Sequence, residues 1–227
     1  MTPEQLQAAR KAARLTQQQA AARLGVSQPY LALMECSRRP VPARMQSKIA
    51  KLYNLGPIAL PLESRFIHSP DASTLAYAVA NLGYPPFRHL RRGRTANPAL
   101  VLLAVLSSNA VEVRVIEALP WILGEYIDLD WDWLVRECKL RDLQNRLGFL
   151  ITLLQRAARK ESNRVWEQRL GPIAEILNRA RLAREDTLCQ ENLTFAERRW
   201  LRRHRSAEAR HWNLLTDVDF EAVPPAA

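Results

Sequence analysis

The stretch TQQQAAARLGVSQPY, residues 16–30, carries uncharged amide side chains where two short helices are expected to meet. A glutamine amide donates and accepts hydrogen bonds at the same time, which suits it to recognise a polar edge on another molecule. A packed helix pair has no need for such groups on its rim. A run of glutamines is also common on a helix face that only contacts water. Gln17 and Gln28 are therefore candidate binding residues. The helices that hold them help to decide between a binding role and a face that only contacts water.

Basic charge is concentrated in the same part of the chain. The 227 residues include 33 Lys or Arg and 23 Asp or Glu, a net charge of +10. Residues 1–60 hold nine basic and two acidic side chains, whereas residues 161–227 hold eleven of each. This asymmetry indicates a polyanion-binding module joined to a segment with another task.

Helix start and stop signals surround the glutamines. Thr2, Thr16 and Ser27 each stand where a hydroxyl can cap a helix, and Gly25 is placed to end the second helix in a left-handed conformation. The expected helices cover residues 3–13, residues 17–24, a segment from residue 28 and a segment from about residue 42.

The apolar spacing predicts which face of the third helix is buried. Leu31 and Met34 should face the core, so Gln28, Pro29 and Leu33 should face outward. A helix, a tight turn containing glycine and a second helix with short or amide-bearing residues at its start form a helix-turn-helix arrangement.

Residues 6–53 resemble the phage-repressor-like (XRE) helix-turn-helix family in the layout LTQ...A..LGVS...L..ME...R.P......IA..Y. The resemblance implies that Gln17 hydrogen-bonds a DNA phosphate and braces the recognition helix. It also implies that Gln28 enters the major groove, where its amide can pair with N6 and N7 of adenine. Arg10 and Glu35 match a pair that forms an internal salt bridge in such domains.

The DNA-contacting residues that this resemblance implies include three arginines at phosphate-binding positions. The full set is Gln17, Gln28, Pro29, Tyr30, Leu33, Arg38, Arg39 and Arg44. Two positions depart from the family pattern. Ser37 stands where glycine is common, which predicts a slightly different loop. Leu33 replaces a polar side chain, so it either contacts thymine methyl groups or packs against another chain.

The remainder of the chain predicts a larger α-helical domain. Gly is rare, and no alternating β-branched segment is bounded by hairpin turns. VEVRVIE, residues 111–117, is the one stretch that resembles a strand, and its flanking sequence favours a helix. Expected helices cover residues 71–82, 97–106, 108–126, 130–140, 141–159, 161–185 and 194–204.

We therefore expect an all-α protein with a repressor-like helix-turn-helix domain and six or seven helices in a larger C-terminal domain. The expected divisions are a DNA-binding domain over 1–57, a linker over 58–73, an interaction domain over 74–212 and a tail over 213–227.

An acidic and aromatic segment lies between Val115 and Val135, without Lys or Arg. Such a cluster could hold Mg²⁺ together with a substrate phosphate. Asp128 and Asp130 precede a predicted helix, however, where the helix dipole favours negative charge. The tryptophans of this segment suit a core. We expect a structural role.

Two basic stretches are candidate partner-binding surfaces. FRHLRRGR, residues 87–94, could be a solvated loop, an accessory phosphate contact or a docking patch for an acidic protein. TFAERRWLRRHRSAEARHW, residues 194–212, predicts a basic amphipathic helix that docks by its aromatic face, binds a partner or does both. The candidate partner-binding residues are Arg88, Arg91, Arg92, Arg198, Arg199, Arg202 and Arg203.

Several function classes lack their usual signals. The three cysteines are far apart and lack metal-ligand spacing, so we expect reduced thiols. No Gly-rich phosphate loop, HExxH or GxSxG occurs. The N-terminus lacks the apolar core of an export signal, and no apolar run has the length of a membrane span. We expect a cytoplasmic protein that is not an enzyme, with no catalytic residues, metal or cofactor.

Residues 129–154, LDWDWLVRECKLRDLQNRLGFLITLL, resemble the C-terminal part of abortive-infection (AbiE-type) antitoxins. That resemblance implies an autorepressing antitoxin whose larger domain neutralises a co-encoded nucleotidyltransferase-like toxin. Those antitoxins carry a winged N-terminal domain, unlike the domain expected here.

The expected partners are thus double-stranded operator DNA, a toxin protein and, for paired half-sites about 34 Å apart, a second copy of the chain. One alternative is a ligand-responsive repressor with a small-molecule sensor domain and no toxin partner. Another is an RNA-binding or toxin-inhibiting protein whose helix-turn-helix is vestigial.

Overall fold

The chain forms two compact units, residues 1–63 and 64–227, in a computed structural model. The structure describes residues 3–62 and 71–219, so the expected cap at Thr2 and part of the predicted linker lie outside the described residues. Each unit has its own core and is described by itself. Within the described ranges, no helix is both long enough and apolar enough to cross a membrane.

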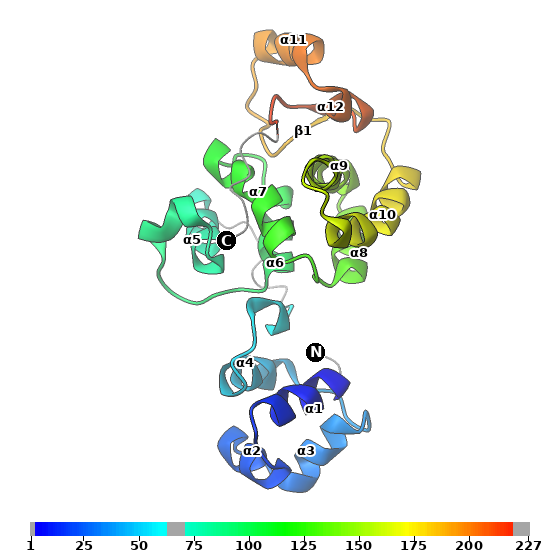
Figure 1. Cartoon of the computed structure of the whole chain (residues 1–227). Helices are drawn as coiled ribbons and strands as arrows, with labels where there is room; N and C mark the ends of the chain where they lie inside the picture. Colours follow the sequence, from blue (N-terminus) through cyan, green and yellow to red (C-terminus); the bar gives the residue numbers. More distant parts are fainter. Residues whose placement is uncertain (1–2, 63–70, 220–227) are drawn as a thin grey trace. The chain divides into compact units, whose positions relative to one another are not determined.

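The first unit is a cluster of short helices around one apolar core (Figure 1). Its described helices are α1 (Pro3–Ala12), α2 (Gln17–Leu24), α3 (Gln28–Glu35), α4 (Ala43–Leu52) and the 3₁₀ helix η1 (Pro57–Ala59). Leu6, Leu31, Met34 and Ile49 are fully buried in that core. The predicted inward face of α3 is therefore confirmed.

Local capping sets the limits of α2 and α3. The Thr16 hydroxyl accepts the Gln19 N–H at 3.1 Å, and the Gln19 side chain accepts the Thr16 N–H at 3.0 Å, which completes a capping box. α2 ends at Gly25, whose φ of +73° is left-handed. The Ser27 side chain accepts the Tyr30 N–H and so begins α3. The predicted roles of Thr16, Gly25 and Ser27 are confirmed.

The second unit is also mostly helical, which confirms the all-α fold class (Figure 1). Its described helices exceed the six or seven predicted. The elements are α5 (Ala72–Leu82), η3 (Pro85–Leu90), α6 (Pro98–Ser107), α7 (Val113–Glu125), α8 (Trp131–Leu140), α9 (Gln144–Lys160), α10 (Arg164–Arg179), β1 (Asp186–Thr187), α11 (Phe195–His204), α12 (Ala207–His211) and β2 (Leu214–Leu215).

Helix α6 lies in the core of the second unit. Every residue from Pro98 to Leu106 is buried, and α5, α7 and α8 contact this helix. A helix that is apolar on all sides needs such enclosure. The Asn97 side chain accepts the Ala99 N–H at 2.9 Å, so the predicted start of this helix is confirmed.

Long-range pairing overrides two predicted helix boundaries. The helix predicted over 161–185 ends at Arg179, and the chain then passes through a bend at residues 183–184 into β1, which pairs in parallel with β2. The helix predicted over 108–126 begins at Val113, because Ala110 forms an antiparallel bridge with Gln190. Neither pairing leaves a periodic signal in the sequence, since each involves only one or two residues.

The predicted tail over 213–227 is also wrong at its start. Leu214 and Leu215 form β2, and both are buried in the second unit together with Thr216. Two consecutive leucines are too few to show the periodic pattern of a strand or a helix, so only their tertiary contacts reveal that they belong to the core.

Arg146 of α9 ties three parts of this unit together. Its guanidinium, only 4% exposed, pairs with Asp186 of β1 at 2.8 Å and donates to the Leu106 carbonyl at 2.7 Å. A buried cation needs this complete set of acceptors to offset its loss of hydration.

Gly148 of α9 lets a large side chain lie against the helix. Trp212, 1% exposed, packs over this position and donates its indole N–H to Thr152 at 2.8 Å. A Cβ atom at Gly148 would lie 2.4 Å from the indole ring. Gly171 of α10 has no neighbouring atom within 4 Å of such a Cβ and offers a matched comparison.

We predict that Gly148→Ala destabilises the second unit by about 3 kcal/mol, because the rigid indole has to move out of a close-packed core. Gly171→Ala should change the stability by less than about 1 kcal/mol, because the preference of alanine for a helix interior is opposed by the clash of its Cβ with the ring of Pro172. Urea unfolding followed by tryptophan fluorescence measures both variants. Equal stability of the two would contradict the packing described for Trp212.

Candidate nucleic-acid interface

The turn between α2 and α3 holds the start of α3 on the surface of the first unit. α2 buries Ala20 and Leu24, and α3 buries Leu31, so these helices pack by one face each. Gln28 and Pro29, at the first turn of α3, remain exposed. Further along the same helix, Leu33 is also exposed and Tyr30 is half-buried. The four candidate residues of α3 thus lie at or near the surface.

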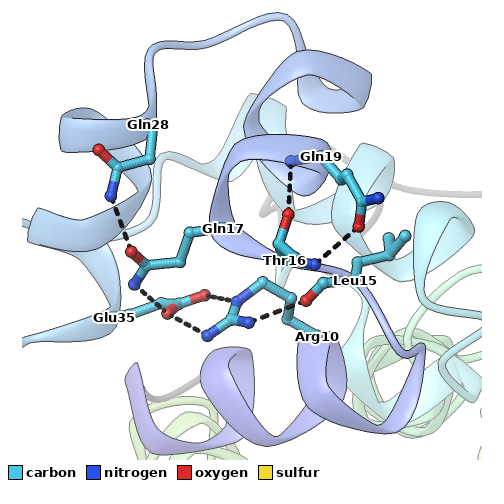
Figure 2. Close-up of polar contacts among 7 residues, drawn as sticks. All are labelled: Arg10, Leu15, Thr16, Gln17, Gln19, Gln28 and Glu35. Carbon is cyan, nitrogen blue, oxygen red and sulfur yellow. Dashed lines mark hydrogen bonds and ion pairs between the residues drawn. The ribbon is translucent and has the colours of Figure 1, made fainter.

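A buried ion pair connects α1 to the end of α3. Arg10 donates to the two carboxylate oxygens of Glu35 at 2.7 and 2.9 Å, and to the Leu15 carbonyl at 2.9 Å (Figure 2). The Glu35 side chain is fully buried and that of Arg10 is 10% exposed. The internal salt bridge implied by the family resemblance is therefore present.

Burial raises the pKa of the Glu35 carboxyl, but hydrogen bonds from Arg10 and Gln17 and the charge of Arg10 outweigh it, so the pKa lies below its ordinary value. The hydrogen bond to Glu35 in turn raises the pKa of Arg10 above its ordinary value. Both groups are therefore charged at neutral pH, and each needs the other because a lone buried charge is costly.

Two glutamines extend this ion pair to the protein surface. Gln17 donates its Nε2 to Glu35 at 2.9 Å, and Gln28 donates its Nε2 to the Oε1 of Gln17 at 2.8 Å (Figure 2). We name this connected set, Arg10, Glu35, Gln17 and Gln28, the glutamine relay.

The chemistry of the relay fixes the orientation of each amide. The ionised Glu35 only accepts hydrogen bonds, so Gln17 has to present its NH₂ group to it. The Oε1 atom of Gln17 then faces Gln28, so Gln28 has to present its NH₂ group as the donor. Within the described residues, the Oε1 of Gln28 and one N–H of its amide are left to face solvent. The spacing of the sequence did not reveal this link between the ion pair and the two glutamines.

Three predicted phosphate-binding arginines lie beyond α3. Arg38, Arg39 and Arg44 are all exposed. The backbone N–H groups of Arg38 and Arg39 donate to the Leu33 carbonyl at 3.0 and 3.1 Å, which ties this turn to the helix. The Arg39 guanidinium lies 4.8 Å from the centre of the Tyr30 ring. These contacts tie the backbone of Arg38 and Arg39 to Leu33 and place the Arg39 guanidinium beside Tyr30 of α3.

Ser37 keeps the backbone conformation that a glycine would adopt there. Its φ is +61°, in the left-handed region. The replacement of glycine therefore does not divert the backbone at this residue, contrary to our expectation of a different loop. The serine carries the conformational cost instead, which is roughly 1–2 kcal/mol for a residue with a Cβ.

The predicted partner-binding arginines before α6 are partly engaged within the second unit. Arg91 donates to the Gly83 carbonyl at 3.0 Å, and the Arg92 guanidinium lies 3.7 Å from the centre of the Tyr77 ring. Arg88 is exposed. Arg91 and Arg92 thus have structural contacts, with the residue that ends α5 and with the middle of that helix, respectively.

The arginines of α11 divide into two pairs. Arg202 makes hydrogen bonds of 2.7–3.1 Å to Glu185, and Arg198 donates to backbone carbonyls of residues 191 and 193. Arg199 and Arg203 are exposed and make no ion pair within the described residues. Of the four α11 arginines, the structure therefore leaves Arg199 and Arg203 available to a partner.

The acidic and aromatic segment has structural contacts. Asp130 caps α8 by accepting the Trp133 N–H at 3.0 Å, and Asp128 pairs with Arg169 at 2.9 Å. Trp121 is buried. In the described parts of the chain, no group of three or more potential ligands is arranged to hold a metal ion.

We predict that Glu35→Gln destabilises the first unit by about 3 kcal/mol, because Arg10 loses its buried counter-ion. In the wild type, the pair stabilises fully above the ordinary glutamate pKa of about 4.3, and this stabilisation is lost as pH falls through the lowered pKa of folded Glu35. The variant should lack this acid-dependent loss.

Amide hydrogen exchange of α1–α4 as a function of pH measures this effect, because all six tryptophans lie at residue 121 or later and do not report on the first unit. The double change Arg10→Met/Glu35→Leu leaves no unpaired charge and should cost less than Glu35→Gln alone. Unchanged exchange in Glu35→Gln would show that the ion pair does not support the first unit.

Comparison with known proteins identifies the first unit. Residues 4–61, about a quarter of the chain, match a family model described as a helix-turn-helix domain. No curated protein and no solved structure matches the chain significantly. The matched residues cover the described helices of the first unit except Pro3, and they include the glutamine relay. The N-terminal unit of this protein is a helix-turn-helix domain, the kind of domain by which regulators bind DNA.

Proposed function

We propose that this protein is a sequence-specific transcriptional regulator that acts as a repressor and reads its operator mainly through Gln28. The observation that carries this proposal is the glutamine relay, which ends in a surface amide of fixed orientation. The basic charge of the first 60 residues supports attraction to a polyanion.

The free groups of Gln28 match one base edge. With α3 in the major groove, the Oε1 atom can accept from N6 of adenine while the remaining N–H donates to N7. The third hydrogen-bonding position of the amide is already occupied by Gln17. Because Gln17 and Glu35 hold the side chain in place, less conformational entropy is lost when it meets the base.

The surrounding candidates suit supporting roles. Arg38, Arg39 and Arg44 are exposed cations that can bind phosphates and position α3. Leu33, 37% exposed, offers an apolar contact to a thymine methyl group. Pro29 contributes to the exposed first turn of the same helix.

Gln28→Ala is predicted to weaken binding to the preferred duplex by about 1–3 kcal/mol and to reduce discrimination at one base pair. The double variant Arg38→Gln/Arg39→Gln should instead weaken binding to all sequences and lower the slope of log K against log salt by roughly one unit for each lost phosphate contact. Fluorescence anisotropy with matched and mismatched duplexes at several salt concentrations separates the two effects.

If Gln28→Ala lost the same affinity for matched and mismatched duplexes, this would argue against base recognition by this side chain. A salt slope that stays the same in the arginine variant would remove Arg38 and Arg39 from the interface. Binding of every duplex equally by the wild-type chain would exclude sequence-specific regulation.

For the second unit, we propose that it binds a co-encoded protein. In its most specific form, the proposal is that this protein is a toxin, which the second unit neutralises. Support comes from α11, where Arg199 and Arg203 lie beside two exposed aromatic side chains. Phe195 is 80% exposed, and Trp200 is 52% exposed and stacked on His204 at 4.5 Å. Tryptophan and arginine dominate the binding energy of many protein interfaces. This composition favours a protein partner over the alternative of a small-molecule sensor.

Arg199→Glu/Arg203→Glu is predicted to weaken binding of the neighbouring gene product at least about 10-fold, because each change reverses a charge in the interface. Arg184→Glu/Arg210→Glu, which reverses two exposed arginines outside α11, serves as the matched control. Isothermal titration calorimetry with the purified neighbouring protein measures both. Equal affinity of the two variants would exclude α11, and a copurified small molecule in place of a protein would favour ligand sensing.

A further inference from the structure

A surface groove lies between α8 and α10 of the second unit. It has a volume of about 410 Å³ and is lined by Trp131, Asp132, Val135, Arg136, Lys139, Leu140, Ile173 and Ile176. Two of its aliphatic side chains remain in water, since Leu140 is 72% exposed and Ile176 is 47% exposed. The face therefore carries both an apolar hollow and apolar side chains that protrude beside it.

The charges of this groove have both signs. Asp132 and Lys139 are exposed, line the same groove and make no ion pair within the described residues. They are seven residues apart on α8, which places them on one face about 10 Å apart along the helix. Arg136, between them, pairs loosely with Glu137 at 3.6 Å. A partner of one charge sign would be repelled at one of the two positions.

The α8 residues of the groove are complementary to their own copies in an antiparallel arrangement. A twofold axis between Val135 and Arg136 would bring Asp132 of one chain opposite Lys139 of the other, twice. The same axis would bring Trp131 opposite Leu140. Such a surface satisfies the condition for a twofold interface, in which each contact occurs twice with the roles exchanged.

We infer that this α8–α10 face is the surface by which two copies of the chain associate. The inference rests on the proposed function, because a dimer lets two helix-turn-helix domains read the paired half-sites of an operator. The occupant of the groove is Leu140 of the second copy, and the ion pairs between Asp132 and Lys139 set the antiparallel register. A twofold pairing of α11 would instead bring together Arg199 and Arg203, which make no ion pair within the described residues, whereas each Arg136 beside the proposed axis keeps Glu137 as its counter-ion at 3.6 Å.

A charge exchange tests this arrangement in the full-length protein. Asp132→Lys and Lys139→Asp, each alone, place like charges opposite one another in the homodimer and should raise its dissociation constant at least about 10-fold. A mixture of the two single variants restores both ion pairs and should form a heterodimer, as should the double variant with itself. Sedimentation velocity measures the association against the chain mass of 25.9 kDa.

Leu140→Glu provides a second, apolar test, with Val113→Glu as the control. Val113 is 51% exposed on α7, outside the groove, so both changes place a carboxylate on a surface side chain without opening a core. Only Leu140→Glu should weaken the dimer. Circular dichroism confirms that each variant is folded.

Three results would overturn the inference. The first is a wild-type chain that stays monomeric at about 100 µM, a concentration far above the dissociation constant of a functional dimer. The second is a dimer that survives each of the single charge reversals. The third is a mixture of the two single variants that fails to associate. A monomeric chain that still distinguishes duplexes through Gln28 would overturn the dimer surface and leave the proposed function intact.

Discussion

The buried ion pair between Arg10 and Glu35 is the interaction on which the geometry of the helix-turn-helix domain depends. It holds α1 against the end of α3, and it keeps the Glu35 carboxylate ionised where Gln17 donates to it. Because a carboxylate only accepts, the orientation of two successive amides follows from that charge. The ion pair thus stabilises the fold and also determines which atoms of Gln28 a nucleic acid would meet. Under the proposed function, core stability and base recognition by Gln28 depend on one set of hydrogen bonds.

The second unit uses its arginines in two distinct ways. Arg146 is enclosed and ties α9 to β1 and α6, and Arg202 is engaged by Glu185 on the surface. Arg199 and Arg203, on another face of α11, lack such partners within the described residues. A count of basic residues along the chain therefore overstates the charge that is available to a partner. The groove between α8 and α10 differs again, because it carries both signs of charge and suits association with a second copy.

Much of the first unit could be predicted because its signals are local. A hydroxyl at Thr16 and a glycine at residue 25 act within one turn of the helix they limit, and apolar spacing shows which face of α3 is buried. The short pairing of β1 with β2 could not be predicted in this way. It joins residues 186–187 to residues 214–215 through two residues on each side, too few for an alternating pattern. Ser37 shows a third case, in which the fold retains a left-handed turn despite an unfavourable residue.

The sequence alone determined the helical class, the helix limits around the turn, the exposed position of Gln28 and the concentration of positive charge near the N-terminus. These properties depend on composition and on contacts between residues a few positions apart. Only the tertiary structure decided which polar groups meet: Gln17 with Glu35, Arg202 with Glu185, and Asp186 with Arg146. Such pairs lie 17 to 40 residues apart. Each forms because helix packing brings a donor and an acceptor within 3 Å, and spacing in the sequence carries no trace of that distance.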